Sequence, residues 1–287
     1  MKKIIFLLPG ILVSAFLSAQ PQANKSSLTN KISLSIGQKI IVENTISMES
    51  SMSPGMDITN STTSENLLEV KNNIDNNYTL SSSLTKIKVN MSMMGQATTY
   101  DSEKKEDQDS DIGKAFGGKL NKPTDIILDI NTGKAIPAKQ PEKKKEVEEG
   151  NPMQGLLQML GDNGGDDAIV AGAFELIPQG KSTGDSWVDS SVDKTMKVVR
   201  TYTLKSVIDK EAVIGLAVIM DGTNTLEMQG MQIEFSSTTK TTAEIILNIE
   251  TGLVKKKTSQ SEITGSFEMM GQSVPISAKA NSTSTYK

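Results

Sequence analysis

Methionine is the residue type whose spacing here could do chemistry. The tetrapeptide Met-Met-Gly-Gln occurs at 93–96 and again at 269–272, and the related MQGMQ occupies 228–232. Thioether sulfur is a soft ligand that binds Cu(I), and exported methionine-rich proteins can use it for copper. The candidate copper ligands in the first half of the chain are Met48, Met52, Met56, Met91, Met93 and Met94.

A structural role explains the same methionines more simply. Strand alternation places Met91 and Met93 on one face with Ile87 and Val89, and unbranched Met commonly fills cores. Each nearby glycine then supplies the reversal of a β-hairpin. We expect two-residue turns at Gly95-Gln96, Gly230-Met231 and Gly271-Gln272, which pair Met93 with Thr98, Met228 with Ile233 and Met269 with Val274. The absence of His and Cys removes the usual companions of copper, so no cofactor is predicted.

Catalytic motifs are incomplete throughout the chain. Without His or Cys, every Ser-His, His-metal and Cys-nucleophile arrangement is excluded. The acidic run DQDSDIG at 107–113 has its glycine one place late for a calcium loop, and QGKS at 179–182 lacks the upstream glycine of a phosphate-binding loop. We therefore expect the protein not to be an enzyme.

The N-terminus and composition define the expected compartment and partners. Two lysines precede an apolar run that ends in small residues, which is typical of a signal peptide over 1–19. That run is too short to span a bilayer, and without cysteine no lipoprotein anchor can form. We expect a soluble periplasmic or extracellular protein. Arg200 is the only arginine and the net charge is −4, which disfavours nucleic-acid binding.

A duplication organises the elements that position these residues. TDIILDINTGKAI at 124–136 matches AEIILNIETGLV at 243–254, and each is typical of a strand that ends at a glycine turn. We predict a first β repeat over 20–138 and a second over 178–287. The first repeat carries an acidic insertion, 102–119, expected to be a mobile loop. The fold class is mainly β: two tandem antiparallel meanders that form curved or half-barrel sheets.

A connector over 139–177 separates the two repeats. Apolar residues at helical spacing after Met153 predict a short amphipathic helix, and a second helix is expected from Asp166 until Pro178 stops it. These helices would cover the concave side of the sheets. Trp187, the only tryptophan, follows a turn at Gly184-Asp185 that corresponds to GQKI at 37–40. The candidate residues lining an apolar cavity are Leu156, Leu157, Leu160, Phe174, Trp187 and Phe235.

Several of these motifs together resemble a known family. Pro178 followed by GDSW, the INTG and IETG strand ends, the MMGQ hairpins and the signal peptide are similar to an uncharacterised family of exported Bacteroidota proteins, a domain of unknown function. The resemblance covers nearly all of the mature chain and implies no activity. A looser likeness is to periplasmic lipoprotein-carrier half-barrels, in which a curved sheet and short helices enclose an apolar cavity.

Three functions are compatible with these patterns. The first is a non-catalytic envelope protein that binds a lipid, an acylated peptide or another apolar ligand in a cavity. The second is a structural or protein-interaction module of the envelope with filled cores. The third is Cu(I) binding through Met91 and Met93. A cavity of roughly 300 Å³ or more separates the first from the second, since filled sheets leave none.

Overall fold

The computed structural model describes residues 31–52, 56–93, 95–139, 165–193, 195–228, 231–269 and 272–287. Strands dominate, as the alternating sequence predicts. The N-terminal half contains β1 (Lys39–Met52), β2 (Met56–Ile74), β3 (Asn77–Met93), β4 (Gln96–Asp101), β5 (Thr124–Asp129) and β6 (Ala135–Pro137). The C-terminal half contains β7 (Ser186–Val192), β8 (Met196–Ile208), β9 (Glu211–Met228), β10 (Met231–Asn248), β11 (Val254–Met269) and β12 (Gln272–Tyr286).

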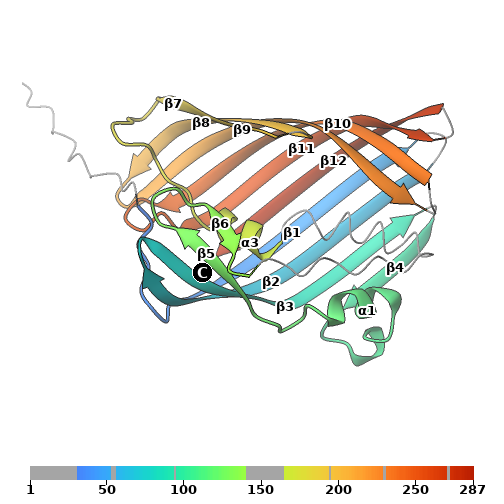
Figure 1. Cartoon of the computed structure of the whole chain (residues 1–287), viewed down its shortest axis with the longest axis horizontal. Coiled ribbons are helices and arrows are strands. Elements are labelled where there is room, and N and C mark those ends of the chain that lie inside the picture. The colour runs from blue at the N-terminus through green and yellow to red at the C-terminus, as the bar shows by residue number, and fades with distance from the viewer. Residues whose placement is uncertain are drawn as a thin grey trace, which may run out of the picture.

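All twelve strands form one open antiparallel sheet (Figure 1). The order is β6-β5-β3-β2-β1-β12-β11-β10-β9-β8-β7, and β4 pairs with the second half of β3. The two halves join at the centre, where β1 pairs with β12 from Val42–Tyr286 to Met52–Ile276. Among the described residues, no pairing connects the edge strand β7 to the opposite edge. In the same residues no helix has the length and apolar character needed to cross a membrane.

The matching strand ends INTG and IETG form the same turn in both halves. The Asp129 side chain accepts hydrogen bonds from the backbone N–H groups of Asn131 and Thr132, and Asn248 accepts from those of Glu250 and Thr251. The glycines that follow, Gly133 and Gly252, have φ of 68° and 72°. An Asx side chain that caps a turn and a glycine with positive φ explain why this motif recurs. The predicted repeat boundaries stay a prediction.

An N-terminal segment ties these two turns together. The N–H of Ile32 donates to the carbonyl of Ile130 at 2.8 Å, and the N–H of Ser33 donates to that of Thr251 at 3.1 Å. Ile32 is 2% exposed, and its side chain lies close to both turn glycines. The segment therefore closes one end of the sheet by bonding to both halves.

The main core occupies only that closed end. Helix α3 (Asp166–Gly172) begins where the sequence predicts and lies on the concave side of the sheet (Figure 1), in contact with β3, β5 and β6. Phe174, just beyond α3, forms a bridge with Leu253, which directly precedes β11. The core contains inward-facing residues of most strands together with Ile32, Val170, Ala173, Phe174 and Ile177. The remaining length of the sheet is left with a concave face that this core does not fill.

The acidic insertion differs from the mobile loop that its composition predicts. It folds into a 3-10 helix, η1 (Lys105–Asp107), and α1 (Asp111–Gly117), whose N-cap is Ser110. The Ser110 hydroxyl accepts from the Gly113 N–H at 3.0 Å. A second core then forms between α1 and the sheet, containing Ile58, Ile87, Val89, Met91, Tyr100 and Ile112. Two apolar residues on one side of α1, Ile112 and Phe116, outweigh the charge around them.

The predicted hairpin registers are wrong by two residues, although the predicted inward face of β3 is right. Met93 pairs with Gln96, Met228 with Met231 and Met269 with Gln272, so each reversal starts one residue earlier than expected. Gly95, with φ of 78°, is the second residue of its turn. A shift by two leaves every side chain on its original face. Met91 is accordingly buried, 3% exposed, in the second core, which confirms its inward position.

We predict that alanine is about equally costly at Gly252 and at Gly133. Both substitutions place a side chain at positive φ, which costs about 1 kcal/mol. A Cβ at Gly252 would lie 3.4 Å from the Glu175 carbonyl oxygen and from Leu176 Cδ2, and one at Gly133 would lie 3.9 Å from Ile32 Cδ1. These are ordinary van der Waals contacts, so the backbone conformation decides the cost at both positions. Urea denaturation of both variants measures the two losses, and a loss at one position alone would contradict the prediction.

A second prediction concerns the folded insertion. Ile112→Ala removes a buried side chain from the second core and should lower local stability by about 2 to 3 kcal/mol. Hydrogen exchange of the β3 and β4 amides reports this loss. The control is Lys114→Ala, an exposed position on the same helix. Unchanged exchange in Ile112→Ala would show that the insertion does not depend on this contact.

Candidate functional site

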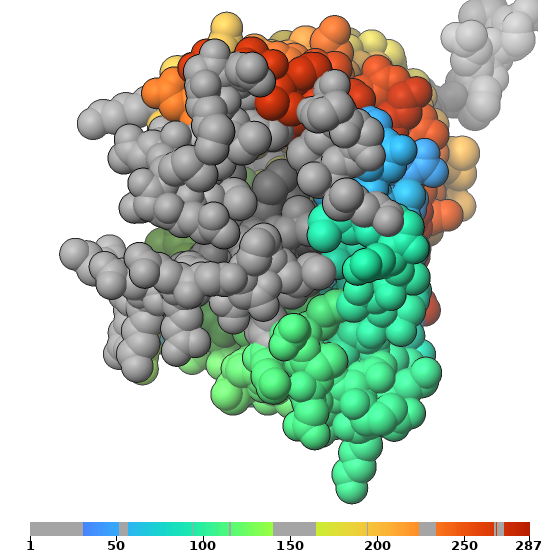
Figure 2. Space-filling view, turned by 90° about the vertical axis from the view of Figure 1, so that its right-hand side faces the viewer, coloured from blue at the N-terminus to red at the C-terminus, as the bar shows by residue number. Residues whose placement is uncertain are grey.

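A trough of about 1240 Å³ runs along the concave face beyond the main core. Seen end-on in Figure 2, the C-terminal strands form the upper side of the molecule, the N-terminal strands lie at the right, and the insertion lies below. Side chains from β1–β3, β7–β12, α1 and α3 line the trough. It is therefore a feature of the whole sheet, and neither half alone could enclose it.

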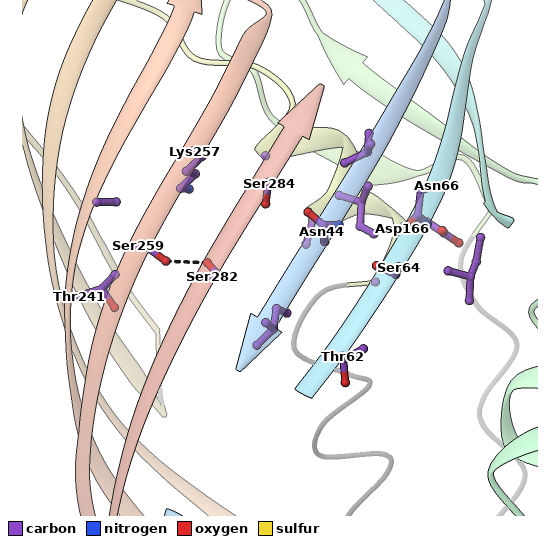
Figure 3. Close-up of a pocket in the computed structure, with 18 of the residues that line it drawn as sticks. Asn44, Thr62, Ser64, Asn66, Asp166, Thr241, Lys257, Ser259, Ser282 and Ser284 are labelled. Atoms are coloured by element: carbon purple, nitrogen blue, oxygen red, sulfur yellow. Dashed lines mark hydrogen bonds between the residues drawn. The ribbon is translucent and has the colours of Figure 1, made fainter. Parts of the chain in front are cut away.

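The floor of the trough is polar. Strand pairing places Lys257 next to Ser284, Ser284 next to Asn44, and Asn44 next to Ser64, so a row of polar side chains crosses four strands (Figure 3). A parallel row lies closer to the open end, where the hydroxyls of Ser259 and Ser282 are 2.7 Å apart. Hydroxyl and amide groups on adjacent strands supply both donors and acceptors.

Both sides of the trough carry apolar residues, alongside charged ones that include Lys119, Lys122, Asp193 and Arg200. On the N-terminal side, Ile87 and Val89 of β3 meet Phe116 of the insertion. On the C-terminal side the lining residues are Met196, Val198, Leu216, Val218 and Met220. Several of these side chains are only partly buried, so the sheet leaves apolar surface facing the space. A polar floor between apolar sides suits a ligand that has both kinds of surface.

Buried charge lies where the trough meets the main core. Burial raises the pKa of Glu175 to about 7, because the carboxylate loses hydration that one hydrogen bond from the Leu176 N–H does not replace. Burial lowers the pKa of Lys257, and the nearby Glu175 partly offsets this effect. Lys257 forms no hydrogen bond or ion pair with any described residue. Arg200, by contrast, contacts Asp189 at 3.2 Å.

Asn66 is a second polar group without its full set of partners. It is 2% exposed and lines the trough, yet its Oδ1 has no hydrogen-bond partner among the described residues. A buried acceptor without a donor costs about 1–3 kcal/mol. A ligand or water that donated to Asn66 would recover that free energy.

The three described residues that the sequence predicts to line a cavity lie at or beyond the ends of the trough. Phe174 is buried in the main core, and Trp187 packs against that core with its ring stacked on Tyr202 at 5.2 Å. Phe235 is partly buried on β10, on the same face as Thr239 and Thr241 but farther toward the open end. Leu156, Leu157 and Leu160 lie outside the described residues. Contact of these six residues with a ligand stays a prediction.

Sequence reasoning missed the charged groups of the site. Lys257 is the last of three consecutive lysines, and a register irregularity near Ile246 and Leu247 decides which of them turns inward. Glu175 could have been found from the sequence, since it is the one charged residue in the apolar run AFELI. Among the described residues no group of three or more acidic side chains could hold a metal ion.

Comparison with known proteins identifies the family. A model described as a family of unknown function, DUF6263, matches residues 75–254, which is more than half of the chain. The chain belongs to the DUF6263 family. This confirms the expectation of an uncharacterised family. No curated protein matches this DUF6263 chain.

Solved structures show only loose similarity to the DUF6263 chain. Lipovitellin, in a structure of its lipid-protein interactions, is 12% identical with a TM-score of 0.47; the match covers 87% of this chain and 25% of lipovitellin. An outer membrane channel from Pseudomonas putida F1 is 8% identical with a TM-score of 0.26, covering 89% and 97% of the two chains. OpdQ from Pseudomonas aeruginosa is 6% identical with a TM-score of 0.24, and the match covers 88% of this chain and 99% of OpdQ. At these scores no function is transferred.

The raised pKa of Glu175 predicts a pH-dependent gain from Glu175→Gln. Between an unfolded pKa of 4.5 and a folded pKa of about 7, only the folded state holds the proton, so wild-type stability falls as pH rises through this window. The variant avoids this loss. It should be more stable than wild type by about 2 kcal/mol at pH 8, after allowance for solvent screening, and equal to it at pH 4.

Chemical denaturation at both pH values measures this difference. Glu262→Gln on the exposed face of β11 is the matched control and should show no pH-dependent gain. A constant difference between Glu175→Gln and wild type from pH 4 to pH 8 would contradict the assignment.

Proposed function

We propose that this protein is a non-catalytic exported protein that binds an amphipathic ligand, such as a lipid or an acylated peptide, in the trough. The observation that carries the proposal is the trough itself: about 1240 Å³, with apolar sides and a polar floor. Ligand sites in proteins usually enclose about 300–1,000 Å³ and combine apolar walls with a few polar groups. The space here is large enough for a ligand with an extended apolar part.

The lining residues support this proposal over a module without a cavity. A sheet that only needed to fill its own core would carry bulky side chains along the whole concave face. Here the floor carries mainly small Ser, Thr and Asn side chains, while the bulky residues lie at the closed end and along the sides. The unsatisfied Asn66 also favours a partner with a polar group.

Other features support the non-catalytic and exported parts of the proposal. The chain contains no His and no Cys, which removes the commonest general bases and nucleophiles. Met91 and its neighbours form an apolar core, and this supports a packing role for Met91 in preference to Cu(I) binding. The signal-like N-terminus supports export to the periplasm or the exterior. That segment lies outside the described residues.

Extraction of bound molecules tests the proposal directly. Protein purified from its native host under mild conditions should release an acyl-bearing compound into organic solvent, identified by mass spectrometry at near one molecule per chain. The extracted protein should rebind that compound. If material from the native host carries nothing and the extracted protein binds no apolar compound, the proposal is wrong.

Substitution of neighbouring residues on β9 locates the binding surface. Val218 lines the trough, whereas Ile219, 48% exposed, faces the opposite side of the sheet. A carboxylate in the trough would be desolvated by an apolar ligand, so Val218→Asp should weaken retention of the ligand about tenfold or more. Ile219→Asp should retain it as wild type does. Equal retention by both variants would exclude the trough as the site.

A further inference from the structure

We propose that the polar end of the ligand is an anionic head group, a carboxylate or a phosphate borne on an apolar chain, and that Lys257 is its counter-ion. This inference rests on the proposed function and specifies the class of ligand. It starts from the position of one lysine on the concave face. Lys257 lies between Ile245 of β10 and Ser284 of β12, at the inner end of the trough.

The surroundings of Lys257 can complete an anion site. Ser284 and Asn44 follow it across the floor, in the row shown in Figure 3. A hydroxyl and an amide can both donate to an oxyanion beside the ammonium group. On the other side, Ile245 is buried in the main core. The site thus has polar donors along the floor and apolar surface toward the closed end.

The other charges at this end already have partners. Arg200 contacts Asp189, and the Asp166 carboxylate at the start of α3 accepts from the Ser82 hydroxyl at 3.0 Å. Glu175, whose carboxylate acts to raise the pKa of Lys257, makes no ion pair with it within 4 Å. Among the described residues, three lysines that line the trough have no close counter-charge, Lys119, Lys122 and Lys257, and only Lys257 of these is withdrawn from the exposed surface. A ligand anion would compensate the cost of holding this ammonium group away from water.

An anion carried on an apolar chain suits this geometry better than a free anion. A small ion would have to leave water to reach the inner end and would gain only the polar contacts with Lys257, Ser284 and Asn44. An acyl chain adds contact with the apolar sides, which lie between Lys257 and the open end and include Val198, Val218 and Met220. Burial of that chain contributes about 25 cal/mol per Å² of apolar surface.

Ligands that share one chain and differ in head group test the inference. Dodecanoate, dodecyl phosphate and dodecanol would be titrated against delipidated protein by calorimetry. Wild type should bind the two anions about tenfold more tightly than the alcohol. Lys257→Met should bring the anions to the affinity of the alcohol and leave the alcohol unchanged, and Lys257→Arg should keep the preference because it keeps the charge.

The matched control is Lys256→Met, one residue away on the exposed face, which should behave as wild type. Thermal denaturation would establish that each variant is folded, and Lys257→Met should be at least as stable as wild type because it removes a desolvated charge. If all three ligands bind wild type equally and Lys257→Met changes nothing, the inference is wrong while the proposed function stands.

Two further arms separate the remaining outcomes. If none of the three chains binds wild type, the proposed function itself fails. Inorganic phosphate, at the concentrations used for dodecyl phosphate, should neither bind nor displace it. Displacement by inorganic phosphate would mean that a free anion is the ligand, and would overturn the requirement for an apolar chain.

Discussion

The pairing of β1 with β12 is the constraint on which the rest of this structure depends. It joins the first described strand to the last, in register from Val42–Tyr286 to Met52–Ile276. Without it the two halves would be separate meanders, each with two edges and a shallow concave face. With it, a single sheet curves far enough for its two outer parts to face each other across a common space. Contacts this distant in sequence carry a large loop-closure cost, which the long strands on both sides must repay.

The uneven placement of bulky residues follows from the length of those strands. β2 has 19 residues and β9 has 18, well beyond the usual 3–10. At about 3.3 Å per residue such strands extend for about 60 Å, more than one small core can cover. Apolar residues and the segment through α3 close one end, and small polar residues continue along the floor. The cavity therefore arises from which side chains lie where along each strand.

The structural features that could be predicted from the sequence are those that depend on local residue patterns. Strand alternation located most of the strands, and the DINTG and NIETG motifs located equivalent turns, because an Asx cap and a positive-φ glycine act within five residues. Burial of Met91 followed from its neighbours in β3. The folded insertion and the inward position of Lys257 depend on contacts between distant strands and on a register irregularity, and composition records neither. The hairpin registers failed by two residues, because a Met-Gly pair fits a turn with glycine at either central position.

Two groups that weaken this fold are groups that the proposed ligand would satisfy. Lys257 holds a desolvated charge, Asn66 holds a buried acceptor without a donor, and both line the trough. Replacement of either of them by an apolar residue of similar size would be expected to stabilise a domain whose only task was to fold. The exposed face of the same strands holds its charges in surface ion pairs such as Lys205–Glu244, so the chain can pair charges where water is available. Asn72 Oδ1, which lies outside the trough, also lacks a partner among the described residues, so what favours the proposed ligand is the presence of Lys257 and Asn66 together in one trough.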